Sequence, residues 1–310
     1  MPTFPLLRLP GLILFDVFKS LNIEEKIKLS LCSKKVSIQI NNARLYSQKV
    51  IVDLDMKYQD IEGYSENIKN AFVIINRSTG TINNPDIPRC QIEEHTVPVI
   101  SFAKGITAFW ENDQEGFLSV IRYILKIFRC KISISEHYKS GSFVNTISEL
   151  LNLQVEFKKL HFYFYGSKDE NLFWNQISNK FGLVEDLSIL TDEDPNVRPV
   201  LTSWPHKYTI MNSDWFTLES LLERTWTTIT LWNPPLGNKD LDVILRKWKT
   251  GGFPNLERLE IHGHRFTNGT TILGMNLEDL DGKTVQTDDE SKKATIQLGF
   301  RRIDISVTPF

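Results

Sequence analysis

The chain has 310 residues, with 36 Lys and Arg against 38 Asp and Glu, so its formal charge is −2. With 41% hydrophobic and 24% charged residues, it has the composition of a globular protein. A nucleic-acid-binding protein clusters Lys and Arg to displace counterions from phosphates, whereas this chain mixes both signs throughout, so we expect no nucleic-acid partner. No apolar run approaches the ~20 residues that a membrane helix needs, so we expect no membrane partner either.

The three cysteines, Cys32, Cys90 and Cys130, are far apart and form no C-x-x-C pair. This pattern is neither a disulfide framework nor a zinc site. The start of the chain shows no recognisable secretion signal. These observations predict an intracellular protein, located in the cytoplasm, the nucleus or both.

Apolar residues recur at spacings of three and four near the start of the chain, which predicts an amphipathic helix beginning just after Pro10. Asn22 can cap a second helix, in which Glu24 and Lys28 pair on the solvent-exposed face. Ser33 can cap a third helix. Three helices of this length bury too little surface to be stable alone, and they contain no metal or disulfide ligands. A partner is therefore implied.

These helices resemble an F-box. The residues that carry the resemblance are Leu9-Pro10-Gly11-Leu12-Ile13-Leu14-Phe15-Asp16-Val17-Phe18-Lys19-Ser20-Leu21, then Ile27, Leu31 and Cys32-Ser33-Lys34-Lys35. The run departs from the family pattern at Leu12, where the family often has an acidic residue, and at Val36, where it often has tryptophan. With the large domain after it, this segment resembles the expanded nematode F-box proteins that have a type-2 F-box-associated domain.

The resemblance implies a non-catalytic substrate-recognition subunit of an SCF-type E3 ubiquitin ligase. Such a subunit bridges a target protein and a Skp-family adaptor, and reaches a cullin ligase through that adaptor. Residues 1–45 would be the F-box, and residues 46–310 the recognition domain. The adaptor-binding residues would be Leu9, Pro10, Ile13, Leu14, Val17, Phe18, Ile27 and Leu31. The alternative is a helical cap that only shields one end of the larger domain.

Beyond residue 46 the pattern changes to the alternation that is typical of strands. We expect strands at 50–55, 71–75 and 106–110, loops at 79–85 and around Pro88 and Pro98, and a helix at 116–128. Two closing strands are expected at 294–300 and 303–307.

An L-x-x-L-x-L template then recurs, with a helix-like segment in each interval. It is filled at 127–132, 157–162, 184–189, 226–231 and 256–261, and the long interval before 226 requires an insertion at 192–213. Alternating strands and helices predict an α/β fold with right-handed crossovers and a largely parallel sheet. We therefore expect a short all-α module followed by a leucine-rich-repeat-like domain. Because the strands alternate polar and apolar residues, one sheet face should be open, whereas an ordinary α/β sheet is covered on both faces.

The period of two along a strand predicts what this open face displays. If Leu160, Leu187, Ile229 and Leu259 face the helices, one row on the other face is formed by Tyr163, Leu190, Trp232 and His262. Interface hot spots favour Trp, Tyr and Arg, so we predict Tyr163, Trp232 and Arg258 as target-binding residues. The alternative is that other segments of the chain cover this face and make these residues core.

No phosphate-binding loop, dinucleotide-binding turn or nucleophile elbow is present, so we predict no catalytic residue and no cofactor. His262 and His264 could present two rings to one metal ion, but such sites more often add a third ligand nearby, so no metal is predicted. Cys32 is expected to be a small buried hydrophobe rather than a nucleophile. The rival function is a hydrolase or transferase with an unrecognised site on the open face, which a tightly bound metal or cofactor in the purified chain would favour.

Overall fold

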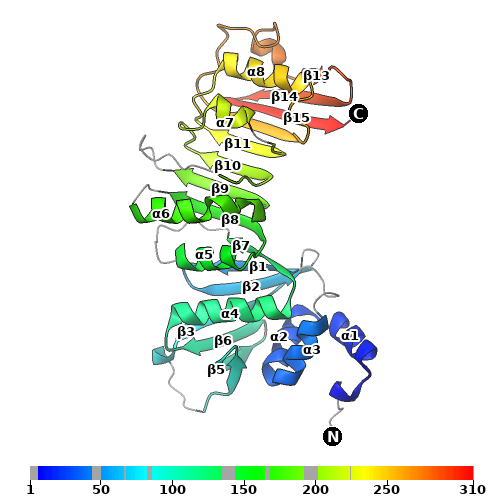
Figure 1. Cartoon of the computed structure of the whole chain (residues 1–310), viewed down its shortest axis with the longest axis vertical. Coiled ribbons are helices and arrows are strands. Elements are labelled where there is room, and N and C mark those ends of the chain that lie inside the picture. Colours follow the sequence, from blue (N-terminus) through cyan, green and yellow to red (C-terminus); the bar gives the residue numbers. More distant parts are fainter. Residues whose placement is uncertain are drawn as a thin grey trace. The chain divides into compact units, whose positions relative to one another are not determined.

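The computed structural model describes residues 6–43, 50–65, 68–81, 86–134, 144–164, 168–191, 202–223 and 225–309. The chain divides into two compact units, Met1–Tyr138 and Lys139–Phe310, and Figure 1 labels most of their elements. Within the described ranges, no helix is long and apolar enough to cross a membrane.

Three helices open the first unit after a 3-10 turn at Leu6–Arg8. They are α1 (Gly11–Ser20), α2 (Ile23–Cys32) and α3 (Lys34–Ala43). As predicted, α1 begins just after Pro10 and Asn22 caps α2. The Asn22 side chain accepts from the Glu25 backbone N–H at 2.8 Å, and the Glu25 carboxylate accepts from the Asn22 N–H at 2.9 Å, which is a capping box. The predicted Glu24–Lys28 pair is also present, at 2.6 Å.

The rest of the first unit is a mixed sheet with one long helix, α4 (Asp113–Ile127). The strand order is β7-β1-β2-β3-β6-β5-β4. The strands are β1 (Val50–Asp55), β2 (Asp60–Ser65), β3 (Ile68–Ser78), β4 (Arg89–Ile92), β5 (His95–Phe102), β6 (Gly105–Trp110) and β7 (Cys130–Ile134). The Tyr123 hydroxyl of α4 lies 2.6 Å from the Ser30 hydroxyl of α2, so the N-terminal helices pack on this long helix. The predicted division of the chain at residue 45 thus falls inside a compact unit, and that boundary stays a prediction.

The expected loop around Pro98 is wrong, because this proline lies inside strand β5. Proline lacks an N–H and interrupts a ladder only where that N–H is needed. Pairing with β6 begins at Val99, and Val99 itself donates to the Pro88 carbonyl at 2.8 Å. Pro98 thus occupies a position where no ladder bond is lost. Of the loop expected at 79–85, Thr79–Thr81 forms a 3-10 turn, and the remainder lies outside the described residues.

The second unit contains five parallel strands followed by an antiparallel edge. The parallel strands are β8 (Phe157–Phe164), β9 (Asp186–Thr191), β10 (Lys207–Met211), β11 (Thr228–Trp232) and β12 (Arg258–His262). Then β15 (Arg302–Pro309) pairs antiparallel with β12, followed by β14 (Lys292–Gly299) and β13 (Thr284–Gln286). The predicted closing strands at 294–300 and 303–307 correspond to β14 and β15.

The prediction of a largely parallel sheet is wrong. Among the strand pairings of the described residues, seven are antiparallel and six are parallel. Short connections such as those between β1 and β2 and between β14 and β15 cannot make the crossover that parallel pairing requires. Strand and helix alternation is limited to part of the chain, and a leucine-rich-repeat-like class stays a prediction.

Strand β10 lies inside the segment 192–213 that was assigned to an insertion. Tyr208 pairs with Leu187 on one side and with Ile229 on the other, and it is 21 residues from each. The long interval therefore holds one additional strand, midway along it. The L-x-x-L-x-L template missed this strand because β10 does not fill the first leucine position of the template.

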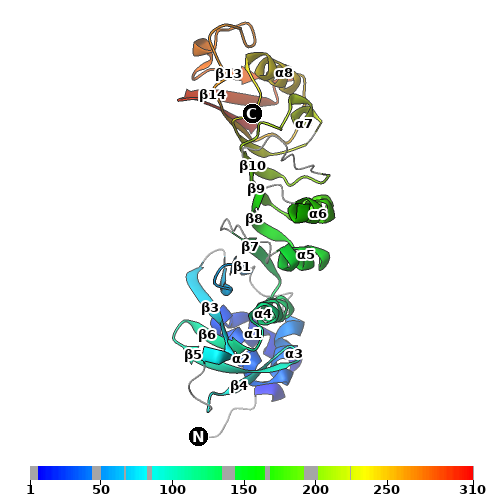
Figure 2. The ribbon, with the colours of Figure 1, turned by 90° about the vertical axis from the view of Figure 1, so that its left-hand side faces the viewer.

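Helices cover one face of the β8–β12 strands, as Figure 2 shows. These helices are α5 (Val144–Asn152), α6 (Lys168–Ile177), α7 (Leu218–Leu222) and α8 (Asn238–Lys249). The predicted inward row, Leu160, Leu187, Ile229 and Leu259, is completely buried, with Tyr208 continuing it on β10. Trp226 and Trp248 are buried as well. The period of two in the sequence thus correctly predicted that this row lies on the face covered by helices.

Candidate functional site

The opposite face of β8–β12 carries a row of partly exposed side chains, which we call the aromatic row: Tyr163, Leu190, Met211, Trp232 and His262. Tyr163 pairs with Leu190, Leu190 with Met211, and Trp232 with His262, so the row crosses five neighbouring strands at one level. Trp232 is 39% exposed although it is a large apolar side chain. The row is therefore a surface feature, in contrast to the buried rows on the covered face.

Trp232 is held in place by His262. The two rings are parallel within 2°, and their centroids are 3.7 Å apart. The His262 Nε2 atom lies 2.9 Å from Glu260 Oε1, so the imidazole is fixed on its edge as well as on its face. A large aromatic side chain with one fixed orientation loses little conformational entropy when a partner covers it.

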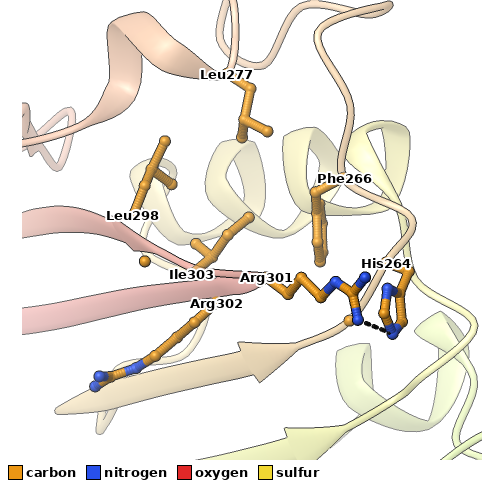
Figure 3. Close-up of a pocket in the computed structure, with 9 residues that line it drawn as sticks. His264, Phe266, Leu277, Leu298, Arg301, Arg302 and Ile303 are labelled. Carbon is orange, nitrogen blue, oxygen red and sulfur yellow. Dashed lines mark hydrogen bonds between the residues drawn. The ribbon is translucent and has the colours of Figure 1, made fainter.

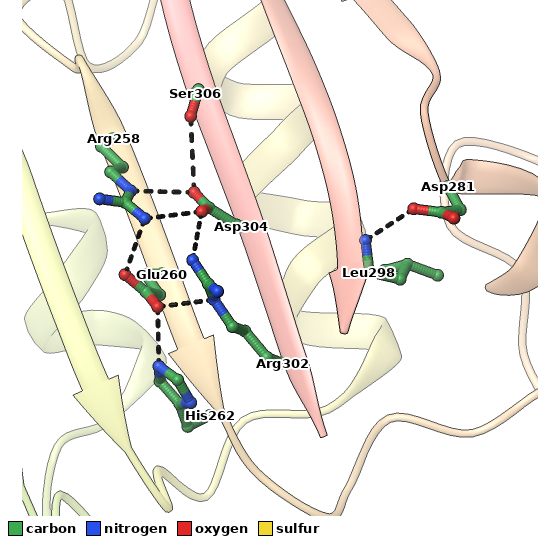
Figure 4. A network of polar contacts seen from close by, with 8 residues as sticks. All are labelled: Arg258, Glu260, His262, Asp281, Leu298, Arg302, Asp304 and Ser306. Carbon is green, nitrogen blue, oxygen red and sulfur yellow. Dashed lines mark hydrogen bonds and ion pairs between the residues drawn. The ribbon is translucent and has the colours of Figure 1, made fainter. Parts of the chain in front are cut away.

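Beside this stack lies a group of charged side chains that we call the ion-pair network: Arg258, Glu260, Arg302 and Asp304 (Figure 4). Arg258 donates to both carboxylate oxygens of Asp304, from Nε at 3.0 Å and from Nη2 at 2.7 Å. Arg302 Nη2 donates to Asp304 at 2.6 Å, and Arg302 Nε forms an ion pair with Glu260 Oε1, also at 2.6 Å. The two positive charges thus balance the two negative ones.

The arginines in turn favour the ionised form of Asp304. Burial of this carboxyl opposes ionisation and is the largest single effect, but the hydrogen bond from Arg258 and the charges of Arg258 and Arg302 together outweigh it. The pKa of Asp304 is therefore lowered. The pKa of Arg258 is raised, first by its hydrogen bond to Asp304.

The network leaves one edge of each guanidinium unused. Both arginines bind the carboxylates through Nε and Nη2, and no described residue is a partner of Nη1 in either. Rigid arginines with remaining donors are suited to contact acceptor groups of a protein partner. The arrangement can therefore bind acceptor groups through the free edges of the two guanidinium groups.

The predicted target-binding residues lie on the same face but not at one point. Arg258 belongs to the network, and Trp232 lies on the neighbouring strand. Tyr163 is three strands away from Trp232, which is about 14 Å at the usual strand spacing. Sequence reasoning did not find Glu260, Arg302 and Asp304 as site residues. Arg302 and Asp304 come into place only through the antiparallel pairing of β15 with β12.

The predicted adaptor-binding residues fall into two groups. Leu14, Phe18 and Ile27 are buried within the first unit, so they hold the helices together. Leu9, Val17 and Leu31 are partly exposed, and Pro10 and Ile13 are exposed. Further apolar side chains on these helices and the turn before them are also exposed, namely Leu7, Leu12 and Ile38, with Leu12 reaching 81%. The helices therefore offer an apolar surface, which Leu12 extends although the sequence prediction did not include it.

His262 and His264, for which no metal site is predicted, contact different partners. His262 contacts Glu260 and Trp232, whereas His264 accepts a hydrogen bond from Arg301 at 3.1 Å. In the part of the chain that the structure describes, no group of three or more His, Cys, Asp or Glu could hold a metal ion.

Two of the three cysteines have thiols that ionise less readily than usual. Cys32 is exposed, so the expectation that it is buried is wrong. Burial raises the pKa of Cys130 to about 12 and also raises the pKa of Cys90. A nucleophilic cysteine needs the opposite shift, toward the thiolate.

Residues 200–261 match the family model described as F-box associated. No curated protein and no solved structure matches the chain. The match supports an F-box-associated protein. In general terms, it also supports a substrate-recognition role in the context of F-box ligases. Members of this family are typically non-catalytic adaptors. The matched segment includes Trp232, Arg258 and Glu260, and it does not reach the N-terminal helices.

Proposed function

We propose that the chain is the substrate-recognition subunit of an SCF-type E3 ubiquitin ligase, acting inside the cell in the cytoplasm, the nucleus or both. Its N-terminal helices bind a Skp-family adaptor, and the open face of β8–β12 binds the target protein. The subunit raises the concentration of target near the ligase and needs no catalytic group of its own. The observation that carries the proposal is the F-box-associated match on the strands that bear Trp232 and Arg258.

The adaptor side of the proposal is supported by exposed apolar residues on helices α1 and α3. Leu12, Ile13 and Ile38 are each about half exposed or more, and single exposed hydrophobes are common, but several on one small module indicate a partner. Because these side chains are exposed, changing them tests binding without unfolding the module. Ile27, which is buried, is unsuitable for this purpose.

Two single substitutions at neighbouring positions distinguish an F-box from a helical cap with a nonspecific apolar surface. An F-box tolerates an acidic residue at the position of Leu12, so Leu12→Glu should co-purify with a co-expressed Skp-family protein at the wild-type yield. Ile13→Glu places a charge at a position where the F-box pattern is apolar, and it should reduce the yield at least tenfold, since burying an unpaired charge costs more than about 1.4 kcal/mol.

Lys19→Gln, on the same helix and exposed, also lowers the net charge by one and is the matched control for charge. Equal losses for Leu12→Glu and Ile13→Glu would indicate a nonspecific apolar contact, and the wild-type yield for both would contradict adaptor binding through α1. The target side is tested by pull-down from cells with the proteasome inhibited, followed by ubiquitination of each candidate in the reconstituted ligase with and without this chain.

A further inference from the structure

A separate hollow lies between the β14–β15 hairpin and the loop that follows β12 (Figure 3). Its cavity has a volume of about 430 Å³. Its walls include the apolar side chains Phe266, Leu277, Leu298 and Ile303, and its rim includes His264 and Arg301. The pocket lies outside the segment that matches the F-box-associated family, and it is distinct from the aromatic row.

The loop that forms one wall is fixed to helix α8 by part-buried polar contacts. The Asn238 amide donates to the Thr267 and Thr270 carbonyls at 2.6 and 2.8 Å, and its oxygen accepts from the Thr267 N–H at 3.0 Å. Asp242 accepts from the Leu273 N–H at 2.7 Å. The pocket is therefore formed before any ligand enters.

The rim carries a positive charge without a carboxylate partner. Arg301 Nη1 donates to His264 Nε2 at 3.1 Å, since a guanidinium group cannot accept a hydrogen bond. Among the described residues, no Asp or Glu pairs with Arg301, whereas the adjacent Arg302 contacts both Glu260 and Asp304. Arg301 also lies over the ring of Phe300, which is 90% exposed at the tip of the hairpin.

We propose that this pocket binds a peptide segment of a protein partner that carries a carboxylate next to an apolar side chain. The apolar side chain would lie among Phe266, Leu298 and Ile303, and the carboxylate would pair with Arg301. The volume is in the range that accepts such groups, and one planar guanidinium matches one carboxylate. A phosphate, with about two negative charges, is usually met by several arginines, so a carboxylate fits better. This site goes beyond the proposed ligase function and requires neither the adaptor nor the open face.

The probe for the test is 4-phenylbutyrate, which joins an aromatic ring to a carboxylate, and its neutral counterpart is 4-phenylbutanamide. Both are titrated into the full chain with labelled Ile and Leu methyl groups, and the NMR shifts of the Leu277, Leu298 and Ile303 methyls are followed. We expect both probes to shift these methyls. The carboxylate should bind about three- to fivefold more tightly than the amide, as is usual for an exposed ion pair.

Variants of Arg301 identify the source of this preference. Arg301→Gln should abolish the difference between the two probes, and Arg301→Glu should favour 4-phenylbutylamine over 4-phenylbutyrate. Arg265→Gln, an exposed arginine on the wall loop, should keep the wild-type preference. Unchanged circular dichroism and melting temperature establish that each variant is folded.

Three results would overturn the proposal. These are pocket methyls that do not shift, equal affinity for carboxylate and amide in the wild type, and a preference that survives Arg301→Gln. If phenyl phosphate binds more than tenfold more tightly than 4-phenylbutyrate, the group that the pocket recognises is a phosphate rather than a carboxylate. Loss of adaptor binding in Ile13→Glu has no bearing on these measurements, so the two proposals fail independently.

Discussion

The two faces of strands β8–β12 are built from alternate residues of the same strands, and they differ completely in character. Leu231 points to the helices and is 0% exposed, whereas its neighbour Trp232 points to the other side and is 39% exposed. The covered face is a continuous apolar core, while the open face pairs an aromatic row with a balanced ion-pair network. Under the proposed function, stability and target recognition therefore lie on opposite sides of one sheet.

Contacts between neighbouring side chains, rather than burial, keep the side chains of the open face ordered. His262 is stacked on Trp232 and bound to Glu260, and the network fixes both arginines. Ordering these groups before a partner arrives lowers the entropic cost of binding. Substitutions on this face should therefore affect recognition more than folding, and the reverse should hold on the covered face.

The largest effect on stability is expected from the covered face. Leu231→Ala removes a completely buried side chain between the sheet and the helices, and it should destabilise the second unit by about 2–5 kcal/mol. Urea unfolding followed by tryptophan fluorescence measures this, because six of the seven tryptophans lie in the second unit. Val243→Ala, which shortens an exposed apolar side chain on α8, is the control and should stay within about 0.5 kcal/mol of the wild type.

A smaller effect is expected from the ion-pair network. Asp304→Asn keeps the shape of the side chain but removes the charge that both arginines contact, and it should cost about 2 kcal/mol, as for hydrogen bonds to charged groups. Glu257→Gln, on an exposed side chain next to Arg258, is the charge-matched control. If both variants have the same midpoint of urea unfolding as the wild type, the network adds nothing to stability and the open face is only loosely ordered.

Local periodicity was sufficient to predict which face each residue occupies. Leu160, Leu187, Ile229 and Leu259 were assigned to the helix side from alternation alone, and their register across the sheet agrees. The helix-like segment expected between the strands at 226–231 and 256–261 corresponds in the same way to helix α8. These features depend on residues that are close in sequence, where the period of a strand or helix is visible.

The ion-pair network could not be predicted by the same means. Arg258 and Asp304 are 46 residues apart, and they meet only because β15 returns antiparallel beside β12. Nothing in the local pattern of β15 reveals which strand it joins. The same reason accounts for the error over the parallel sheet, since periodicity identifies strands but does not give their partners or directions.

Trp232→Ala tests the open face with a still smaller change in stability. Loss of the stacked ring should cost about 1 kcal/mol, because the stack with His262 is removed but little buried volume is lost. Capture of a target confirmed by reconstituted ubiquitination should fall at least tenfold in the same variant, while Val243→Ala should capture normally. A stability loss comparable to that of Leu231→Ala would mean that Trp232 is core, and it would remove this row from the binding surface without affecting adaptor binding.

The smallest and most specific effect is the pH dependence of the Asp304 contribution. Because the pKa of Asp304 is lower in the folded protein than its ordinary value of about 3.9, the folded state binds this proton less readily than the unfolded state. The stabilisation is therefore fully present above about pH 4 to 5 and is lost as the pH falls through the folded-state pKa. The difference in unfolding free energy between the wild type and Asp304→Asn should be constant from pH 7 to 5 and should shrink below pH 4, since the other carboxyls titrate in both proteins and cancel. A difference that grows on acidification would show that burial of Asp304 outweighs its two arginines, and the network would then be a cost to the fold rather than a support.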